Sequence, residues 1–172
     1  ASGHARIVLV VPAERVGAYA ELPWLPVAVI SVVAGGPTRA ASVAAGIEAL
    51  ERAPGEPAAA LLIHDVARPG VTADMFEQVA AAAARGGAAI PALPIHDTVK
   101  RIQIEADGSA QSAGTIDRTT LRAAQTPQGI ARRHVAAFLT ALLERGNTAS
   151  DDASILESCD IPVALVGGAE RL

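Results

Sequence analysis

Five short apolar runs, separated by segments of helical character, constrain the fold of this chain most. The runs do not alternate apolar with polar residues, which is typical of strands buried on both faces of a parallel sheet. Because predicted strands and helices follow one another in turn, we expect a three-layer α/β fold with right-handed crossovers and a mostly parallel sheet. The runs cover residues 7–11, 27–33, 59–63, 88–93 and 163–166.

Two of the intervening segments have clear helix signals. The first begins at Thr38, a favourable N-cap with apolar residues at helical spacing behind it. The second begins at Thr72 or Asp74 and ends at the pair Gly86-Gly87. Helices are expected over residues 38–52, 72–85, 131–145 and 151–159.

Residues 97–116 depart from this alternation of predicted strands and helices, and their pattern predicts a hairpin. Its residues are polar and alternating, and Asp107-Gly108 between alternating runs is a strong hairpin signal. Val99 falls on one face while Ile102 and Ile104 fall on the other, so two faces carry apolar groups. We predict an arm that packs on a second copy and makes a homodimer; a hairpin folded onto its own domain is the alternative.

The charge balance excludes some classes of partner. With 14 basic and 18 acidic residues the net charge is −4, and aromatic residues make up 2% of the chain. We therefore expect no nucleic-acid partner, because neither a basic surface nor a stacking platform is present in the composition. A small phosphorylated substrate remains compatible, since a few arginines and lysines form a local anion site.

Cysteine usage and hydropathy point to a cytoplasmic protein. The one cysteine, Cys159, cannot close an intramolecular disulfide, and the four histidines lack the spacing of a zinc site. Each apolar run is shorter than the roughly 20 residues of a membrane span, and the first residues lack the order of a signal peptide. We expect no membrane partner.

Polar loops follow the predicted strands, where an open α/β sheet binds its ligands. The chain contains no dinucleotide fingerprint, P-loop or serine-hydrolase elbow. Gly35-Gly36 precedes the helix that carries Ser42, and glycines at a helix N-terminus let the backbone approach an anionic ligand. An ordinary tight turn is the alternative reading of this pair.

Asp65 and Arg68 follow the third apolar run within the string HDVARP. An aspartate supplies a hard oxygen ligand for Mg²⁺, and an arginine supplies a bidentate fork for phosphate. An Asp–Arg pair that caps the turn is the alternative.

Two more loops pair hydroxyls with basic side chains, Thr98 with Lys100 and Arg118 with Thr126, as in phosphate sites that work without a protein nucleophile. The acids after Ser150 most simply complement the dipole of the last helix.

Taken in order, six strings resemble the 2-C-methyl-D-erythritol 4-phosphate cytidylyltransferase family of the non-mevalonate isoprenoid pathway: GGPTRAAS, HDVARP, DTVK, DR, QTPQG and SDDAS. The resemblance implies a doubly wound, Rossmann-like nucleotidylyltransferase fold with a β-arm, over about residues 97–118, that joins two subunits. It also implies that CMP passes from CTP to 2-C-methyl-D-erythritol 4-phosphate, giving 4-diphosphocytidyl-2-C-methyl-D-erythritol and pyrophosphate, with Mg²⁺ as cofactor.

The same resemblance implies roles for individual residues. Gly36 and Ser42 fall where the family holds the cytosine nucleotide. Asp65 falls where an aspartate contacts the nucleotide ribose or the metal, which implies a catalytic and metal-binding role for Asp65 and a catalytic role for Arg68. Positions lining the sugar-phosphate pocket match Arg68, Thr98, Arg118, Thr126 and Ser150, and family members commonly have Thr at the last of these.

Two consequences concern the extent of the site. Because Arg118 and Thr126 are expected in the arm region, the pocket would be shared across the dimer. The family's glycine-rich loop with its Arg and Lys, and its C-terminal Lys segment, have no counterpart here, so we expect residues 1–172 to form one domain that is incomplete at both ends. A nucleotidylyltransferase for another sugar or alditol phosphate, and a non-catalytic dimerisation module, are the alternatives.

Overall fold

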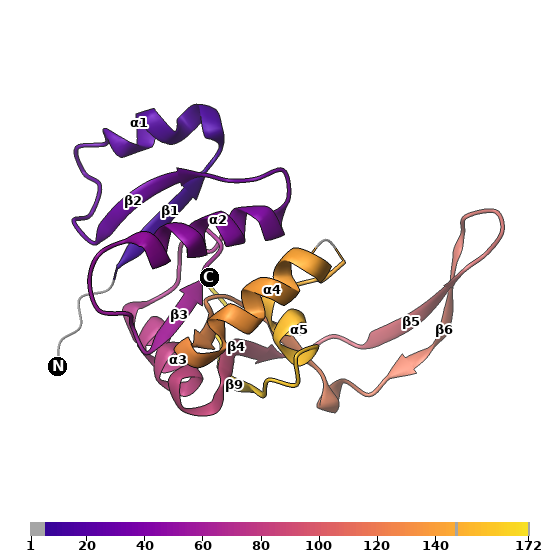
Figure 1. Cartoon of the computed structure of the whole chain (residues 1–172). Helices are drawn as coiled ribbons and strands as arrows, with labels where there is room; N and C mark the ends of the chain where they lie inside the picture. Colours follow the sequence, from indigo (N-terminus) through magenta and orange to yellow (C-terminus); the bar gives the residue numbers. More distant parts are fainter. Residues whose placement is uncertain (1–5, 147, 172) are drawn as a thin grey trace.

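A computed structural model describes residues 6–146 and 148–171, whose elements form an α/β fold with a protruding arm (Figure 1). Near the N-terminus, β1 (Ile7–Val11) and β2 (Val29–Ala34) pair in parallel. The short helix α1 (Val16–Ala20) lies on one side of this pair and α2 (Arg39–Arg52) on the other (Figure 1). The Thr38 hydroxyl caps α2 by accepting from the Ala41 N–H at 3.1 Å, as its sequence position predicts.

A second, five-stranded sheet forms the centre of the molecule. Its hydrogen-bonded order is β3-β8-β4-β7, and β9 also pairs with β4. Since β8 is antiparallel to both β3 and β4, these two strands run in one direction, which β9 shares by pairing in parallel with β4. The strands are β3 (Ala60–Ile63), β4 (Ala88–Pro94), β7 (Arg122–Ala124), β8 (Gln128–Ala131) and β9 (Val163–Gly167).

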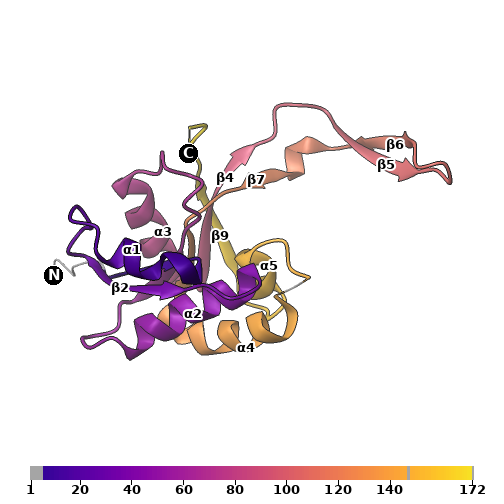
Figure 2. The same cartoon turned by 90° about the horizontal axis from the view of Figure 1, so that it is seen from above.

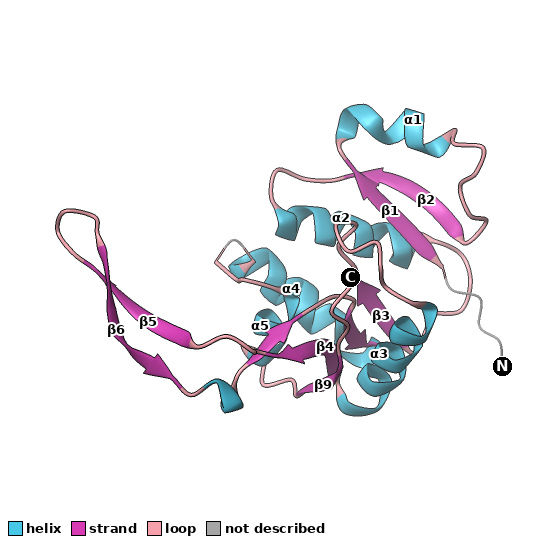
Figure 3. Ribbon diagram, turned by 180° about the vertical axis from the view of Figure 1, so that it is seen from behind, coloured by secondary structure: helices cyan, strands magenta, loops and turns pink. Residues whose placement is uncertain are grey.

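The helices α3 (Ala73–Gly86), α4 (Val135–Arg145) and α5 (Asp152–Glu157) cover the central sheet (Figure 3). The first of them, α3, packs closely on β8, because a Cβ at Gly129 would lie 2.8 Å from Val79 and 3.0 Å from Ala83. On the other face, α4 and α5 bury Phe138 and Leu156. The same apolar cluster includes Ile47 of α2, the helix that also contacts β1, so α2 packs between the N-terminal strand pair and the central part of the molecule.

The hairpin predicted at residues 97–116 is present and projects from the body (Figure 2). It consists of β5 (Val99–Ile104) and β6 (Ala110–Ile116), with Val99 opposite Ile116 and Ile104 opposite Ala110. One residue is skipped in β6 between the partners Gly114 and Ser112, which makes a bulge. Ile102 and Ile104 share one face of the ribbon and are 60% and 62% exposed.

The five predicted strands all form within two residues of their expected limits, and the α/β class is confirmed. Burial on both faces holds for β4, whose Ala88 and Ala89 are fully buried, but not for β1 or β9, where Ile7 and Leu165 are 43% and 57% exposed. The predicted helix over residues 131–145 is partly wrong. Ala131 closes the central strand β8, and α4 begins only at Val135 after a short 3₁₀ turn.

Candidate active site

A cavity of about 310 Å³ opens where loops from β3, β7 and α5 meet. Its wall combines two arginines with two carboxylates, so charges of both signs face the same space. Such an arrangement suits a phosphorylated ligand with an accompanying cation. The wall consists of Arg39, Asp65, Arg68, Ala124, Gln125, Thr126, Gln128, Ser150 and Asp151.

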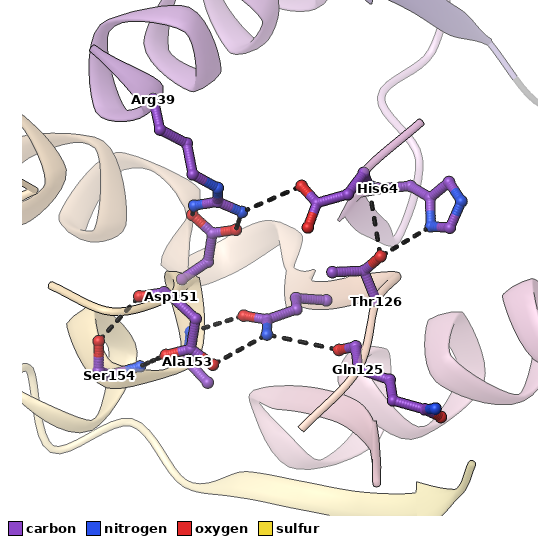
Figure 4. Close-up of polar contacts among 10 residues, drawn as sticks. Arg39, His64, Gln125, Thr126, Asp151, Ala153 and Ser154 are labelled. Atoms are coloured by element: carbon purple, nitrogen blue, oxygen red, sulfur yellow. Dashed lines mark hydrogen bonds and ion pairs between the residues drawn. The ribbon is translucent and has the colours of Figure 1, made fainter. Parts of the chain in front are cut away.

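Thr126 and His64 tie the loop after β3 to the loop before β8 (Figure 4). The His64 Nε2 lies 3.2 Å from the Arg68 carbonyl oxygen, which can only accept, so Nε2 carries the proton. In the neutral ring Nδ1 then accepts from the Thr126 hydroxyl at 3.0 Å. The Asp65 N–H donates to the same Thr126 oxygen at 3.3 Å, so one hydroxyl fixes the backbone that presents Asp65.

The environment of His64 favours this neutral ring. Burial lowers the pKa of His64 below its ordinary value of 6.5, and the Arg68 carbonyl opposes that shift. Phe76 of α3 packs edge-on against the ring, with centroids 5.2 Å apart. His64 therefore connects two loops of the site through its hydrogen bonds.

Gln128 fixes the start of α5. Its buried side chain accepts from the Ala153 N–H at 2.7 Å and donates to Asp151 Oδ2 at 2.9 Å (Figure 4). Asp151 also caps α5 by accepting from the Ser154 N–H at 3.0 Å. The Asp151 carboxylate on the cavity wall thus accepts hydrogen bonds from both Gln128 and Ser154. These two bonds explain why an acidic residue occupies the N-cap of α5.

Arg39, at the start of α2, contacts two carboxylates from distant parts of the chain (Figure 4). It donates to both oxygens of Asp152, at 2.9 and 2.7 Å, and its Nη2 lies 3.6 Å from Asp65 Oδ1. Burial raises the pKa of the Asp152 carboxyl, and the hydrogen bonds from Arg39 act against that shift. The same hydrogen bonds raise the pKa of Arg39, so the guanidinium stays charged.

Of the residues implied by the resemblance, Asp65, Arg68, Thr126 and Ser150 meet on the cavity wall. Thr126 was expected in the arm region and this is wrong, because it lies between β7 and β8, beside the loop after β3. The short strand β7 returns the chain from the arm to the body before residue 126 is reached.

Thr98 and Arg118 lie apart from this cavity, at the base of the arm, and neither lines its wall. Both are exposed, and the Arg118 guanidinium donates to the carbonyl oxygen of His96.

Gly36 and Ser42 also lie outside the cavity wall, in the loop after β2 and the first turns of α2. Ser42 Oγ accepts from the Gly36 N–H at 3.1 Å and donates to the Thr38 carbonyl at 3.0 Å. A Cβ at Gly36 would lie 2.4 Å from the Cβ of Ala41, so this turn requires glycine. In this structure Ser42 holds the shape of the loop that precedes α2.

Sequence reasoning overlooked Arg39, Gln128 and Asp152 as parts of the site. Arg39 and Asp152 lie inside the strings GGPTRAAS and SDDAS, but 113 positions separate them. The only local signal came from Asp152, an acidic residue at a helix start, where acids usually complement the helix dipole. Predicting that Asp152 is buried as part of an ion pair would have required knowing that Arg39 lies beside it.

Comparison with known proteins decides the family. A model described as IspD, 2-C-methyl-D-erythritol 4-phosphate cytidylyltransferase, matches residues 2–171. The chain belongs to this family. A cytidylyltransferase of the same description from Bacillus licheniformis is 38% identical over 168 residues, which cover 95% of this chain and 67% of that protein. The bifunctional enzyme IspD/IspF of Anaeromyxobacter dehalogenans is 40% identical over 162 residues, or 94% of this chain and 40% of that protein.

Solved structures of this cytidylyltransferase family have the same fold. The crystal structure of 2-C-methyl-D-erythritol 4-phosphate cytidylyltransferase from Thermus thermophilus superposes with a TM-score of 0.70 at 32% identity, covering 97% of this chain and 73% of that one. The 4-diphosphocytidyl-2C-methyl-D-erythritol synthase of Anaerococcus prevotii gives a TM-score of 0.77 at 25% identity, covering 96% and 70%. The chain thus spans between two fifths and about three quarters of these four relatives.

Two further observations bear on the cofactor and membrane predictions. Within residues 6–146 and 148–171, no group of three or more His, Cys, Asp or Glu side chains could hold a metal ion, and no helix is long and apolar enough to cross a membrane. Asp65 fits the role of a Mg²⁺ ligand, because its side chain is 45% exposed in the cavity and Mg²⁺ usually takes one or two carboxylates together with substrate phosphates and water.

Proposed function

We propose that the protein containing this chain transfers CMP from CTP to 2-C-methyl-D-erythritol 4-phosphate. An oxygen of the acceptor's phosphate attacks the α-phosphorus of CTP, the bond from that phosphorus to the bridging oxygen of the β-phosphate breaks, and pyrophosphate leaves. This proposal rests on one observation: in a chain of the cytidylyltransferase family, one cavity is lined by Asp65, Arg68, Thr126 and Ser150.

The cavity residues have distinct roles in this proposal. Arg68 binds the acceptor's phosphate with its guanidinium, and the hydroxyls of Thr126 and Ser150 hydrogen-bond the acceptor. Asp65 would hold Mg²⁺, which would supply positive charge to neutralise the charge that develops on the transferred phosphoryl group. Positioning and electrostatics carry such a reaction, so these residues must be held in place rather than act as nucleophiles.

The nucleotide is proposed to bind beside the turn before α2. Gly36 brings backbone close to a ligand there, and Ser42 keeps the turn in shape through its bonds to Gly36 and Thr38. The first turn of α2, a helix of 14 residues, adds N–H groups that favour negative charge.

The arm is proposed to make a homodimer of this protein in the cytoplasm. A two-stranded ribbon is marginally stable alone in water, and here Ile102 and Ile104 are exposed together on one face. A second copy packed on that face would bury both. Arg118 and Thr98 at the arm's base would then be available to the partner's cavity, where Arg118 would add a second cation beside Arg68 for the acceptor's phosphate.

The experiment uses the protein as its gene encodes it. Incubation with CTP, Mg²⁺ and 2-C-methyl-D-erythritol 4-phosphate should release pyrophosphate and form the cytidylyl product. Parallel incubations contain other sugar and alditol phosphates. Activity with one of those alone would show that the acceptor is wrong, and absence of activity with every acceptor would favour a non-catalytic dimerisation module.

A further inference from the structure

A buried carboxylate stands behind the cavity and is linked to Asp65 by one arginine. Asp152, in the first turn of α5, is fully buried, and it is absent from the cavity wall. Arg39 donates to both of its oxygens in a bidentate pair at 2.9 and 2.7 Å (Figure 4). A pair that fully buries a carboxylate while Arg39 stays 43% exposed is a weak source of stability, because desolvation of the carboxylate offsets its attraction to the arginine. The Arg39–Asp152 pair therefore requires an explanation other than stability.

The geometry of Arg39 supplies that explanation. The guanidinium is planar and rigid, so two hydrogen bonds to Asp152 fix both its position and its plane. The same Nη2 that bonds to Asp152 lies 3.6 Å from Asp65 Oδ1. The Asp65 side chain is 45% exposed, so without such a partner its carboxylate could turn in the open cavity.

Three elements meet in this arrangement. Asp152 belongs to α5, Arg39 to the start of α2, and Asp65 to the loop after β3. The Asp65 backbone is already fixed by Thr126, whose hydroxyl accepts its N–H at 3.3 Å. The side chain needs a separate constraint, and among the ion pairs of residues 6–146 and 148–171 Arg39 provides the one that reaches it.

We infer that Asp152 and Arg39 are positioning residues that orient the Asp65 carboxylate for the transfer step. Asp152 immobilises the guanidinium of Arg39, and the immobilised guanidinium holds Asp65. Neither residue needs to touch the acceptor. This inference rests on the proposed function, because it assumes that Asp65 takes part in the reaction.

The main variant is Asp152→Asn, which keeps the size of the side chain and removes its charge. We expect kcat and kcat/KM to fall together by about 10- to 100-fold, as misplacement of a reacting group by about 1 Å does, because the lost interaction matters only in the transition state. Arg39→Lys should cause a similar fall, since a lysine keeps the charge but cannot form the fork.

The matched control is Glu51→Gln, which breaks another bidentate Arg–carboxylate pair, that of Glu51 with Arg132, away from the cavity. Its kcat should stay within about twofold of wild type, as expected for a surface change outside the site. If Asp152→Asn and Arg39→Lys keep wild-type kcat, or if the loss in all three variants follows their loss of thermal stability, the positioning role is overturned.

A structural measurement separates this inference from the proposed function. Crystal structures of wild type and of Arg39→Lys are compared at Asp65; the lysine keeps a cation beside the buried Asp152 but cannot form the bidentate fork, so this variant should fold even if Asp152→Asn does not. We expect the Asp65 carboxylate to leave its wild-type rotamer. An unchanged rotamer overturns the positioning role, whereas a moved rotamer in a protein whose wild type has no transferase activity overturns the proposed function alone.

Discussion

Gln125 and Ala169 exchange two hydrogen bonds across 44 positions of the chain. The Gln125 side-chain amide donates to the Ala169 carbonyl at 2.7 Å, and its oxygen accepts from the Ala169 N–H at 3.0 Å. The segment after β9 is therefore attached directly to the loop that carries Thr126. Gly168 makes this attachment possible, because a Cβ there would lie 2.4 Å from Gln125 Oε1 and 3.0 Å from the Ala92 carbonyl oxygen.

Gly168→Ala should destabilise the protein by about 1–3 kcal/mol, the range expected when a methyl group is forced into a packed site. Gly167→Ala is the matched control, since a Cβ at Gly167 meets nothing within 4 Å, and its effect should stay within about 0.5 kcal/mol. Urea denaturation of both variants gives the two free energies of unfolding. Equal values for the neighbouring glycines would contradict the close contact.

Asp65→Asn should leave folding nearly unchanged and reduce kcat by about 10²- to 10³-fold, as removal of a key charged group from a phosphoryl-transfer site does. Among residues 6–146 and 148–171 the half-exposed side chain makes one ion pair, at 3.6 Å with Arg39, so little stability depends on it. Thermal unfolding and pyrophosphate release are measured on the same preparation. A variant with lowered thermal stability and full activity per molecule would favour the capped-turn interpretation of Asp65 and Arg68.

Arg118→Ala should weaken use of the sugar phosphate far more than binding of CTP. An arginine contact to phosphate contributes about 1.5–3 kcal/mol, or about 10- to 150-fold in binding. The control is Arg52→Ala on α2, where the guanidinium pairs with Glu48 on the surface. KM for the acceptor and Kd for CTP are compared. Equal losses toward both substrates would place Arg118 outside the acceptor site.

Replacement of Ile102 and Ile104 by Lys should prevent the proposed dimer and leave monomers, because both side chains lie on the exposed apolar face of the arm. Gln103→Lys is the control, since Gln103 points to the opposite face of the ribbon. Sedimentation velocity reports the mass of each variant. A wild-type protein that is already monomeric at micromolar concentration would show that the arm has no partner copy.

His64 should make the stability of the protein depend on pH below its ordinary pKa of 6.5. Because burial lowers the pKa of His64 in the folded state, the unfolded chain binds its proton first as the pH falls. The contribution is complete above 6.5 and is lost as the pH falls through the folded pKa. His64→Gln should flatten this part of the curve of unfolding free energy against pH, and an unchanged curve would show that His64 does not contribute.

Local signals in the sequence predicted much of the fold. The apolar run at β4 and the capping threonines Thr38 and Thr72 specify their elements within a residue or two, because burial and capping act over a few neighbouring positions. Asp107-Gly108 likewise predicted the arm, since turn type depends on the turn's own residues.

The tertiary structure alone decided how these pieces meet. Nothing local in Gln128–Ala131 shows that four residues will enter the sheet between β3 and β4, because strand pairing depends on partners about 40 to 70 positions away. For the same reason Thr126 was placed with the arm. Asp152 reads as an ordinary acid at a helix start, and only Arg39, 113 positions earlier, makes its burial possible. The sequence thus determined the local elements and most of the candidate site residues, and long-range pairing determined which of them are neighbours.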